Sequence, residues 1–220
     1  MKTVKDYILQ EKLILKKNII SGGDFVDLGL PSETLWAVAN VGAHDPWELG
    51  DYYMWGETEP RKDFTWSDYK YGKKLSGGKS VMYKYNEKDN LVTLEPEDDI
   101  VTNLFNGNEE FHIPTVEQIK ELFTHTNIRF VNNVNNTGVK GWFFDSKVNG
   151  KRLFIPVSGL KISTNTIYKD ELYILSNEVK TDDYACAKCG RLNNQGSANK
   201  IITNMERPIG CTVRGVKDKK

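Results

Sequence analysis

Cysteine is scarce in this sequence, net charge is absent, and no apolar run is long enough to cross a membrane. The 220 residues contain three cysteines, an odd and small number that excludes a disulfide scaffold. Thirty basic residues balance thirty acidic ones, so no overall field favours nucleic acid or an anionic membrane. A signal peptide is not expected, because Asp6, Glu11 and Lys12 interrupt the apolar residues of the N-terminus. We therefore expect a chain that stays in the cytoplasm or leaves it by a route without a signal.

The short motifs of common catalytic sites are also missing, including the G-x-S-x-G elbow, the P-loop and GxGxxG. One CxxC, from Cys186 to Cys189, could lower a thiol pKa or supply half of a zinc site, but Cys211 is the single further thiol. A strand there would place Cys186 on one face with Tyr184 and Lys188, which favours a structural cysteine. Carboxylates are plentiful, and we interpret them as loop, helix-start or anchoring charges. The sequence predicts no catalytic residue, no metal site and no cofactor.

Residues 1–24 form a segment of their own in the sequence. Val4, Ile8 and Leu15 can share a helical face, whereas residues 13–20 could equally be extended. Residues 21–24, Ser-Gly-Gly-Asp, then resemble a linker. Two interpretations remain open: an N-terminal helix packed on its own domain, or an arm that attaches to a partner. On the second, the anchoring residues are Val4, Tyr7, Ile8, Leu13, Ile14, Leu15, Ile19 and Ile20.

The rest of the chain, rich in aromatic residues (11%), predicts short strands around two helices. We expect strands at 25–30, 35–42, 80–85, 172–175, 184–187 and 210–216, and a long loop over 43–78. Pro96 and Thr115 are predicted to begin the two helices, the second with a capping box to Gln118. Asn149-Gly150 predicts a β-hairpin, because this pair tolerates the positive φ angles of a tight turn. Strands at both ends with helices between them indicate an α+β domain.

Six fragments occur in a fixed order: VDLGLPSETLWAVANVGA, GDYYMWGET, LEPEDD, IPTVEQIKELF, NGKRLFIPVSG and GCTVRGV. In this order they resemble the FISUMP-type major paralogous domains of gut anaerobic bacteria and of the phages that infect them. The resemblance covers residues 25–216, essentially all of the chain except the arm. It divides the chain into an arm and hinge at 1–24, a domain at 25–217 and a basic tail at 218–220.

The resemblance implies a C-type-lectin-like α+β fold with two helices, short antiparallel strands and a long irregular loop region. Formylglycine-generating enzymes and variable receptor-binding proteins of some phages share that fold. In this chain, residues 26–41 would form a hairpin that pairs with residues 211–216. The irregular loop would be tied down by Trp47, Tyr52 and Trp55.

By this resemblance we expect a non-enzymatic virion protein: a head decoration or fibre, or a tail-associated adhesion protein. It would be assembled in the host cytoplasm and attached through its arm to other virion proteins or to sister copies. Its ligand would be a host-surface glycan or protein. The alternative is a bacterial glycan- or protein-binding module, in the cytoplasm or at the cell surface with a signal outside this sequence. A sulfatase-modifying type of enzyme is the third hypothesis.

Candidate ligand contacts come from aromatic residues in irregular segments and from a polar hairpin tip. They are Trp47, Trp55, Trp66, Tyr184, Asn193, Asn194, Gln195 and Asn199. Calcium-dependent sugar binding is not expected. Glu95-Pro96-Glu97 precedes the second predicted helix and indicates a helix start instead of a calcium triplet.

Overall fold

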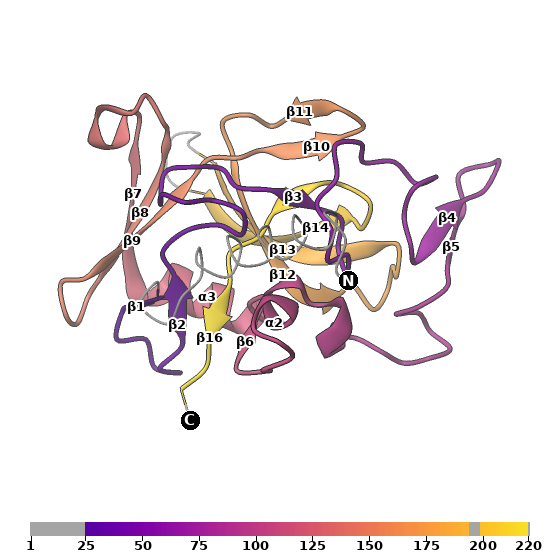
Figure 1. Ribbon diagram of the computed structural model, residues 1–220, viewed down its shortest axis with the longest axis horizontal. Coiled ribbons are helices and arrows are strands. Elements are labelled where there is room, and N and C mark those ends of the chain that lie inside the picture. Colours follow the sequence, from indigo (N-terminus) through magenta and orange to yellow (C-terminus); the bar gives the residue numbers. More distant parts are fainter. Residues whose placement is uncertain (1–24, 194–198, 220) are drawn as a thin grey trace, which may run out of the picture.

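The computed structural model describes residues 25–193 and 199–219 (Figure 1). Its elements, in chain order, are β1 (Phe25–Asp27), β2 (Leu35–Ala37), β3 (Tyr52–Tyr53), β4 (Gly72–Lys74), β5 (Ser80–Met82), a 3-10 turn (Pro96–Asp98), α2 (Ile100–Leu104), β6 (Phe111–His112), α3 (Val116–His125), β7 (Thr126–Val131), a second 3-10 turn (Val134–Asn136), β8 (Gly141–Ser146), β9 (Arg152–Pro156), β10 (Leu160–Ile162), β11 (Asn165–Ile167), β12 (Leu172–Val179), β13 (Cys186–Asn193), β14 (Asn199–Glu206), β15 (Cys211–Thr212) and β16 (Val216–Lys217). The predicted arm and its anchoring residues, Val4 to Ile20, lie outside the described residues.

The sheet β1–β2–β16–β6 joins the start of the domain to its C-terminal segment. Val26 pairs with Trp36 across the β1–β2 hairpin, and Trp36 also pairs with Val216 on β16. Further along, the Val41 N–H donates to the Val213 carbonyl oxygen at 2.9 Å. Trp36, Val213 and Val216 are fully buried, so this pairing closes the core. The predicted contact between residues 26–41 and 211–216 is confirmed, although β15 within it pairs with β3.

The helix α3 starts as predicted. The Thr115 hydroxyl accepts a hydrogen bond from the Gln118 N–H at 3.2 Å, and the Gln118 side chain accepts one from the Thr115 N–H at 2.9 Å. Its buried stripe is Val116, Ile119, Leu122 and Phe123. This stripe packs on the sheet β12–β13–β14, where a Cβ added to Gly190 would lie 2.5 Å from the Ile119 Cγ2. A glycine is therefore required for the helix to approach β13 so closely.

The antiparallel sheet β7–β8–β9 has two faces of different character. Residues alternate between the faces along each strand. The inner face contributes Ile128, Phe130, Trp142, Phe144, Leu153 and Ile155 to a core shared with α3. The outer face carries Arg129, Phe143, Asp145, Arg152 and Phe154. The predicted hairpin at Asn149-Gly150 is confirmed, with a connection at 147–151 in which Gly150 has φ of 71°.

The long region between β2 and α3 is largely irregular and is fixed by buried side chains. The loop predicted over 43–78 lies in it and contains the short strands β3 and β4. Trp55 and Tyr85 are fully buried, with their rings edge to face at 5.0 Å. Arg207, also fully buried, lies 4.7 Å from the Trp55 ring and donates to the Tyr69 hydroxyl at 2.7 Å. It donates in addition to the carbonyl oxygens of Lys84 and Tyr85, at 3.1 and 3.2 Å. One buried guanidinium therefore connects the irregular region to the segment after β14.

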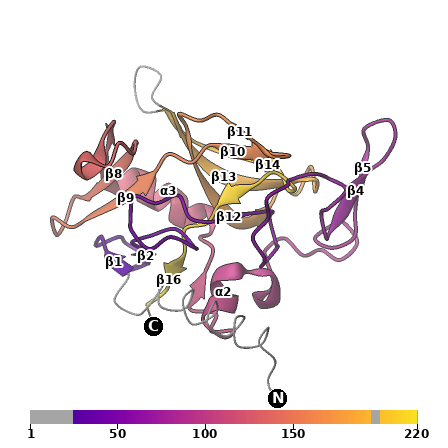
Figure 2. The same cartoon turned by 45° about the horizontal axis from the view of Figure 1, so that its top comes forward.

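The predicted fold class, a C-type-lectin-like α+β domain with two helices, is wrong, because strands form 36% of the structure and helices 11%. The helix predicted to start at Pro96 is a 3-10 turn followed by the five-residue α2. Asp99 interrupts it with φ of −93° and ψ of 113°, and its carboxylate caps the N–H groups of Val101 and Thr102. Much of the chain instead forms small antiparallel sheets, with β4–β5 at one end and β7–β9 at the other (Figures 1 and 2).

Across the residues that the structure describes, no helix has the length and apolar content that a membrane span requires.

Candidate functional site

The three tryptophans predicted to contact a ligand lie in different environments. Trp55 is fully buried and its Nε1 donates to the Ser176 carbonyl oxygen at 2.9 Å, so this prediction is corrected: Trp55 is core and offers no surface. Trp66 is half-buried, and its Nε1 donates to the Glu206 carboxylate at 2.8 Å. Trp47 is half-buried and lines an open cleft. The predicted tryptophans therefore do not form one ligand-binding surface.

The polar residues predicted near the β13–β14 connection are also separated. Tyr184 is half-buried and precedes β13, whereas Asn193 is buried at the other end of that strand. Asn199 pairs with Asn193 through the backbone, but its side chain lies outside the described part of the chain. Asn194 and Gln195 lie outside it as well. Tyr184 lines one cleft, with Lys74, Met82 and Glu206, and Asn193 lines another, so the two residues do not share a site.

The cysteines of the CxxC motif do not form a reactive pair. They alternate along β13 with Cys186 half-buried and Cys189 fully buried, so their side chains lie on opposite faces of the strand. Burial raises the pKa of each of these thiols to about 12. Burial also raises the pKa of Cys211 well above its ordinary value. All three thiols are therefore protonated at neutral pH, whereas a nucleophile or a metal ligand must be a thiolate.

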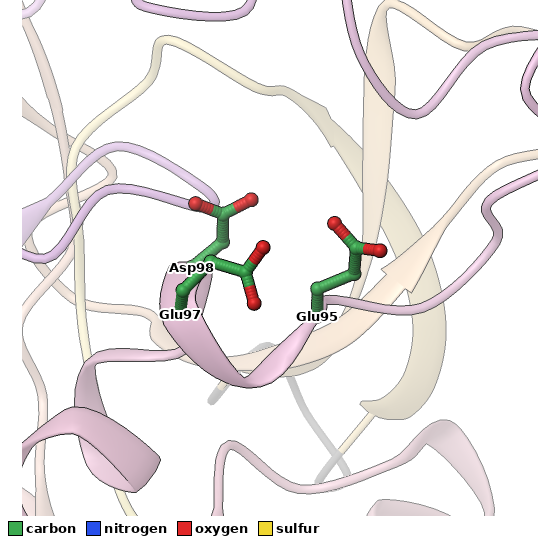
Figure 3. A group of neighbouring side chains, drawn as sticks. All are labelled: Glu95, Glu97 and Asp98. Carbon is green, nitrogen blue, oxygen red and sulfur yellow. The ribbon is translucent and has the colours of Figure 1, made fainter. Parts of the chain in front are cut away.

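Three carboxylates converge beside the 3-10 turn that follows β5, those of Glu95, Glu97 and Asp98 (Figure 3). Their ligand oxygens lie within 4.8 Å of one another, a spacing that a divalent cation could bridge. Lys84 already supplies a positive charge here. Its Nζ lies 2.6 Å from Asp98 and 3.6 Å from Glu97, and it also pairs with Glu95. The cluster is therefore an internal ion-pair network around a lysine.

Asp98 is the buried member of this network, with its side chain 2% exposed. It accepts hydrogen bonds from the hydroxyls of Tyr71 and Tyr85 and lies 3.3 Å from the Lys70 ammonium. Burial raises the pKa of the Asp98 carboxyl, but the hydrogen bonds from Lys84, Tyr71 and Tyr85 outweigh it and hold the pKa below its ordinary value. A carboxylate so fully partnered is typical of a structural charge.

A first open cleft, of about 310 Å³, lies on the outer face of the β7–β9 sheet. Its lining includes Trp47, Phe143 and Phe154. The guanidinium groups of Arg129 and Arg152 lie 4.4 and 5.0 Å from the Phe143 ring, and each donates to Asp145 at 2.8 Å. This cleft is lined mainly by apolar groups, and the charges beside it are paired.

A second open cleft, of about 500 Å³, lies beyond the ends of β7, β8 and β13. This volume falls within the ~300–1,000 Å³ of small-molecule sites. We call it the Tyr168 cleft, and its lining consists of Phe130, Asn132, Lys140, Tyr168, Lys169, Asp170, Glu171 and Asn193. Tyr168 is 56% exposed and has φ of 49°, in the left-handed region that bulky residues seldom adopt.

Asn193 is the unsatisfied group of the Tyr168 cleft. Its side chain is more than nine-tenths buried, and its Oδ1 has no hydrogen-bond donor in the described chain. An unmade hydrogen bond of this kind costs about 1–3 kcal/mol of stability. This wall of the cleft therefore holds a polar group that the described residues do not satisfy.

The charged side chains around the Tyr168 cleft are paired within the described residues, with the exception of the exposed Lys169. Lys140 donates to Asp170 at 2.8 Å. Glu171 accepts hydrogen bonds from the Arg191 Nε and the Tyr173 hydroxyl, both at 2.7 Å. The hydrogen bonds from Arg191 hold the pKa of Glu171 below its ordinary value. The cleft therefore combines a fixed aromatic ring, amide groups, paired charges and one exposed lysine.

The sequence analysis missed Tyr168, Lys140 and Glu171 as candidate contacts. One signal was present, since Tyr168 is followed by three charged residues just before a strand, a composition typical of an exposed turn. Nothing local, however, indicates that this turn meets the end of β13. Their proximity depends on the pairing of β12 with β13, which joins Leu172 to Leu192.

Comparison of the chain with protein-family models, with curated proteins and with solved structures found no match.

Proposed function

We propose that the chain is a non-enzymatic display protein, meaning a rigid domain that presents a recognition surface and is attached elsewhere through its N-terminal segment. The resemblance of the six fragments to FISUMP-type domains supports a virion protein of a phage of gut bacteria. Such a protein is assembled in the host cytoplasm, with other virion proteins or sister copies as partners.

The proposal that the protein is not an enzyme is supported by the protonation and the hydrogen-bond partners of its potentially reactive groups. The thiols of Cys186 and Cys189 lie on opposite faces of β13 and have pKa values raised to about 12. A sulfatase-modifying type of activity, by its resemblance, needs a reactive cysteine pair. Asp98, the most buried carboxylate of the acidic cluster, is held by a lysine and two tyrosines. These groups support structure and are poorly arranged for chemistry.

The rigidity of the irregular region supports the display part of the proposal. Arg207, Trp55 and Tyr85 hold this region in the core, so it is poorly suited to act as a moving lid. Binding surfaces are commonly built on loops that a rigid scaffold positions. Two open clefts lie on such a scaffold, at Trp47 and at Tyr168.

Deleting residues 1–23 tests the attachment part of the proposal. The truncated domain is expected to stay folded, because the closing hairpin begins at Phe25, and to be lost from assembled particles. Thermal melting beside an incorporation or co-sedimentation assay decides the matter. If the truncated domain unfolds, the segment belongs to the core; if it folds and still assembles, attachment lies elsewhere.

The second candidate function is a bacterial glycan- or protein-binding module. The Tyr168 cleft favours it, because an open cleft with an aromatic ring and amide groups can bind a ligand whether or not the protein is part of a virion. The neighbouring genes separate the two. Capsid, portal or tail genes support the display protein of a virion, and polysaccharide-utilisation genes support the bacterial module.

A further inference from the structure

Tyr168 is an exposed aromatic residue whose position is well defined. Its carbonyl oxygen accepts a hydrogen bond from the Glu171 N–H at 2.9 Å, and its ring centroid lies 6.2 Å from that of Tyr173. These contacts hold the turn although φ is 49°, a strained value for a tyrosine. Residues held in such conformations are concentrated at ligand-binding positions. The ring therefore forms a fixed platform at the edge of the cleft.

Asn193 and Asn132 provide amide groups to the same cleft. A carboxamide donates and accepts hydrogen bonds at once, and so matches a ligand whose hydroxyls do the same. The Asn193 Oδ1 is covered in the present side-chain conformation. The last torsion of asparagine is broad, and rotation about it would turn the oxygen toward the cleft. A hydroxyl of a bound ligand would then supply the donor that the described protein residues do not.

The charge of the lining restricts the class of ligand. It holds two basic and two acidic side chains, Lys140, Lys169, Asp170 and Glu171. Lys140 is paired with Asp170, and Glu171 with Arg191. These two pairs leave one exposed ammonium, that of Lys169, so a phosphate or carboxylate ligand would meet a single solvent-screened positive charge and no converging cations in the described lining. An uncharged ligand with many hydroxyls needs no such charge.

We propose that the Tyr168 cleft binds a neutral saccharide unit. The Tyr168 ring stacks against the C–H face of the sugar, since the negative face of an aromatic ring attracts weakly positive C–H groups. Asn193 and Asn132 hydrogen-bond its hydroxyls. The inference rests on the proposed role in recognition and adds to it a ligand class and a location. It requires no calcium, because the contacts are a ring and amides.

Saturation-transfer NMR on the full chain tests this inference directly. The probes are the methyl glycosides of glucose, galactose, mannose and N-acetylglucosamine, with methyl glucuronide as the charged comparison. Tyr168→Ala removes the platform, and Tyr83→Ala is its matched control, because Tyr83 is 57% exposed and lies outside the cleft. Amide chemical-shift mapping locates the site.

At least one neutral glycoside is expected to bind, to shift amides near residues 130, 168–171 and 193, and to outcompete the glucuronide. Tyr168→Ala should weaken that binding at least tenfold, while Tyr83→Ala leaves it unchanged. Absence of binding across the panel, retention of binding in Tyr168→Ala, or preference for the glucuronide would each overturn the inference. A chain that binds no glycoside but still depends on residues 1–23 for incorporation would lose the saccharide site and keep the display role.

Discussion

The acidic turn at Asp98 and the cleft at Tyr168 are two polar regions that differ in how far the protein satisfies its own groups. At Asp98, two lysines and two tyrosine hydroxyls surround one buried carboxylate. At the cleft, the charges other than that of Lys169 are paired, but the Asn193 oxygen has no donor in the described chain. The first region has the composition of a binding site, but its groups are all partnered within the protein, and we call it the closed region. The second region has no conspicuous sequence motif, but it forms an open cleft. Whether a polar group has hydrogen-bond and ion-pair partners within the protein therefore distinguishes structural from functional polar groups better than the number of charged residues nearby does.

Arg207 donates hydrogen bonds to the backbone of Lys84 and Tyr85, two residues of the closed region, and its substitution should lower the stability of the fold the most. Arg207→Met keeps much of the buried stem but removes the donors to the Tyr69 hydroxyl and to three backbone carbonyl oxygens. We expect the free energy of unfolding to fall by about 4 kcal/mol, measured by urea denaturation. Arg129→Met, at a guanidinium that is 48% exposed, is the matched control and should cost less than about 1 kcal/mol. Equal losses in the two variants would show that the irregular region does not depend on Arg207.

Asp98 should make the stability of the closed region sensitive to acid. Its pKa is lower when folded than the unfolded value of 3.8, so its contribution is complete above that value and is lost as the pH falls through the folded-state pKa. Asp98→Asn should cost about 2 kcal/mol at pH 6 and flatten the loss of stability below about pH 4. Urea denaturation from pH 6 to pH 3 measures both. Asp170→Asn, at an exposed pair, should keep the wild-type slope; parallel curves for all three proteins would refute the assignment.

The double substitution Cys186→Ser and Cys189→Ser should have a smaller effect. Folding would bury the serine hydroxyl at position 189 away from water, which costs free energy. We therefore expect the free energy of unfolding to fall by about 1–2 kcal/mol, with the fold retained. Thermal melting of the double variant and of Cys186→Ser alone separates the two positions. A collapse of folding, or bound zinc or iron in elemental analysis of the wild type, would contradict the structural role.

Removal of metal should have the smallest effect. Because Lys84 supplies the cation among Glu95, Glu97 and Asp98, we expect a chelator such as EDTA to move the melting temperature by less than about 1 °C. A shift of many degrees would show that a metal ion stabilises the fold and that Lys84 does not replace it.

Local sequence signals predicted some elements of the fold well. The capping box at Thr115 and Gln118, the hairpin at Asn149-Gly150 and the closing β1–β2 pair all follow from short-range residue chemistry, and each is present. The fold class was missed for physical reasons. The extended backbone at Asp99 shortened one helix, and β7 follows α3 without a turn residue between His125 and Thr126.

The candidate site was harder to predict, because it depends on contacts between distant segments. Trp55 and Tyr168 show this in opposite ways: a tryptophan in an irregular segment is core, and a tyrosine beside charges is exposed. Side-chain burial is decided by the tertiary packing around each residue, which composition does not encode. The proximity of residues 168–171 and 193 follows from the pairing of β12 with β13. Residues 130–140 belong to a separate sheet and reach this cleft through tertiary packing, with Lys140 paired to Asp170.

The most direct test of the contrast between the two regions uses the same replacement in both. Asp98→Leu and Asn193→Leu each substitute a buried polar side chain with an apolar one of similar shape. Urea denaturation at pH 7 should show a loss of about 3–5 kcal/mol for Asp98→Leu, which strands a lysine and two tyrosine hydroxyls. Asn193→Leu should stay within about 1 kcal/mol of the wild type, because its oxygen has no partner in the described chain to lose. Similar losses in the two variants would contradict the account, since they would mean that the Asn193 side chain is as much a part of the closed structure as Asp98.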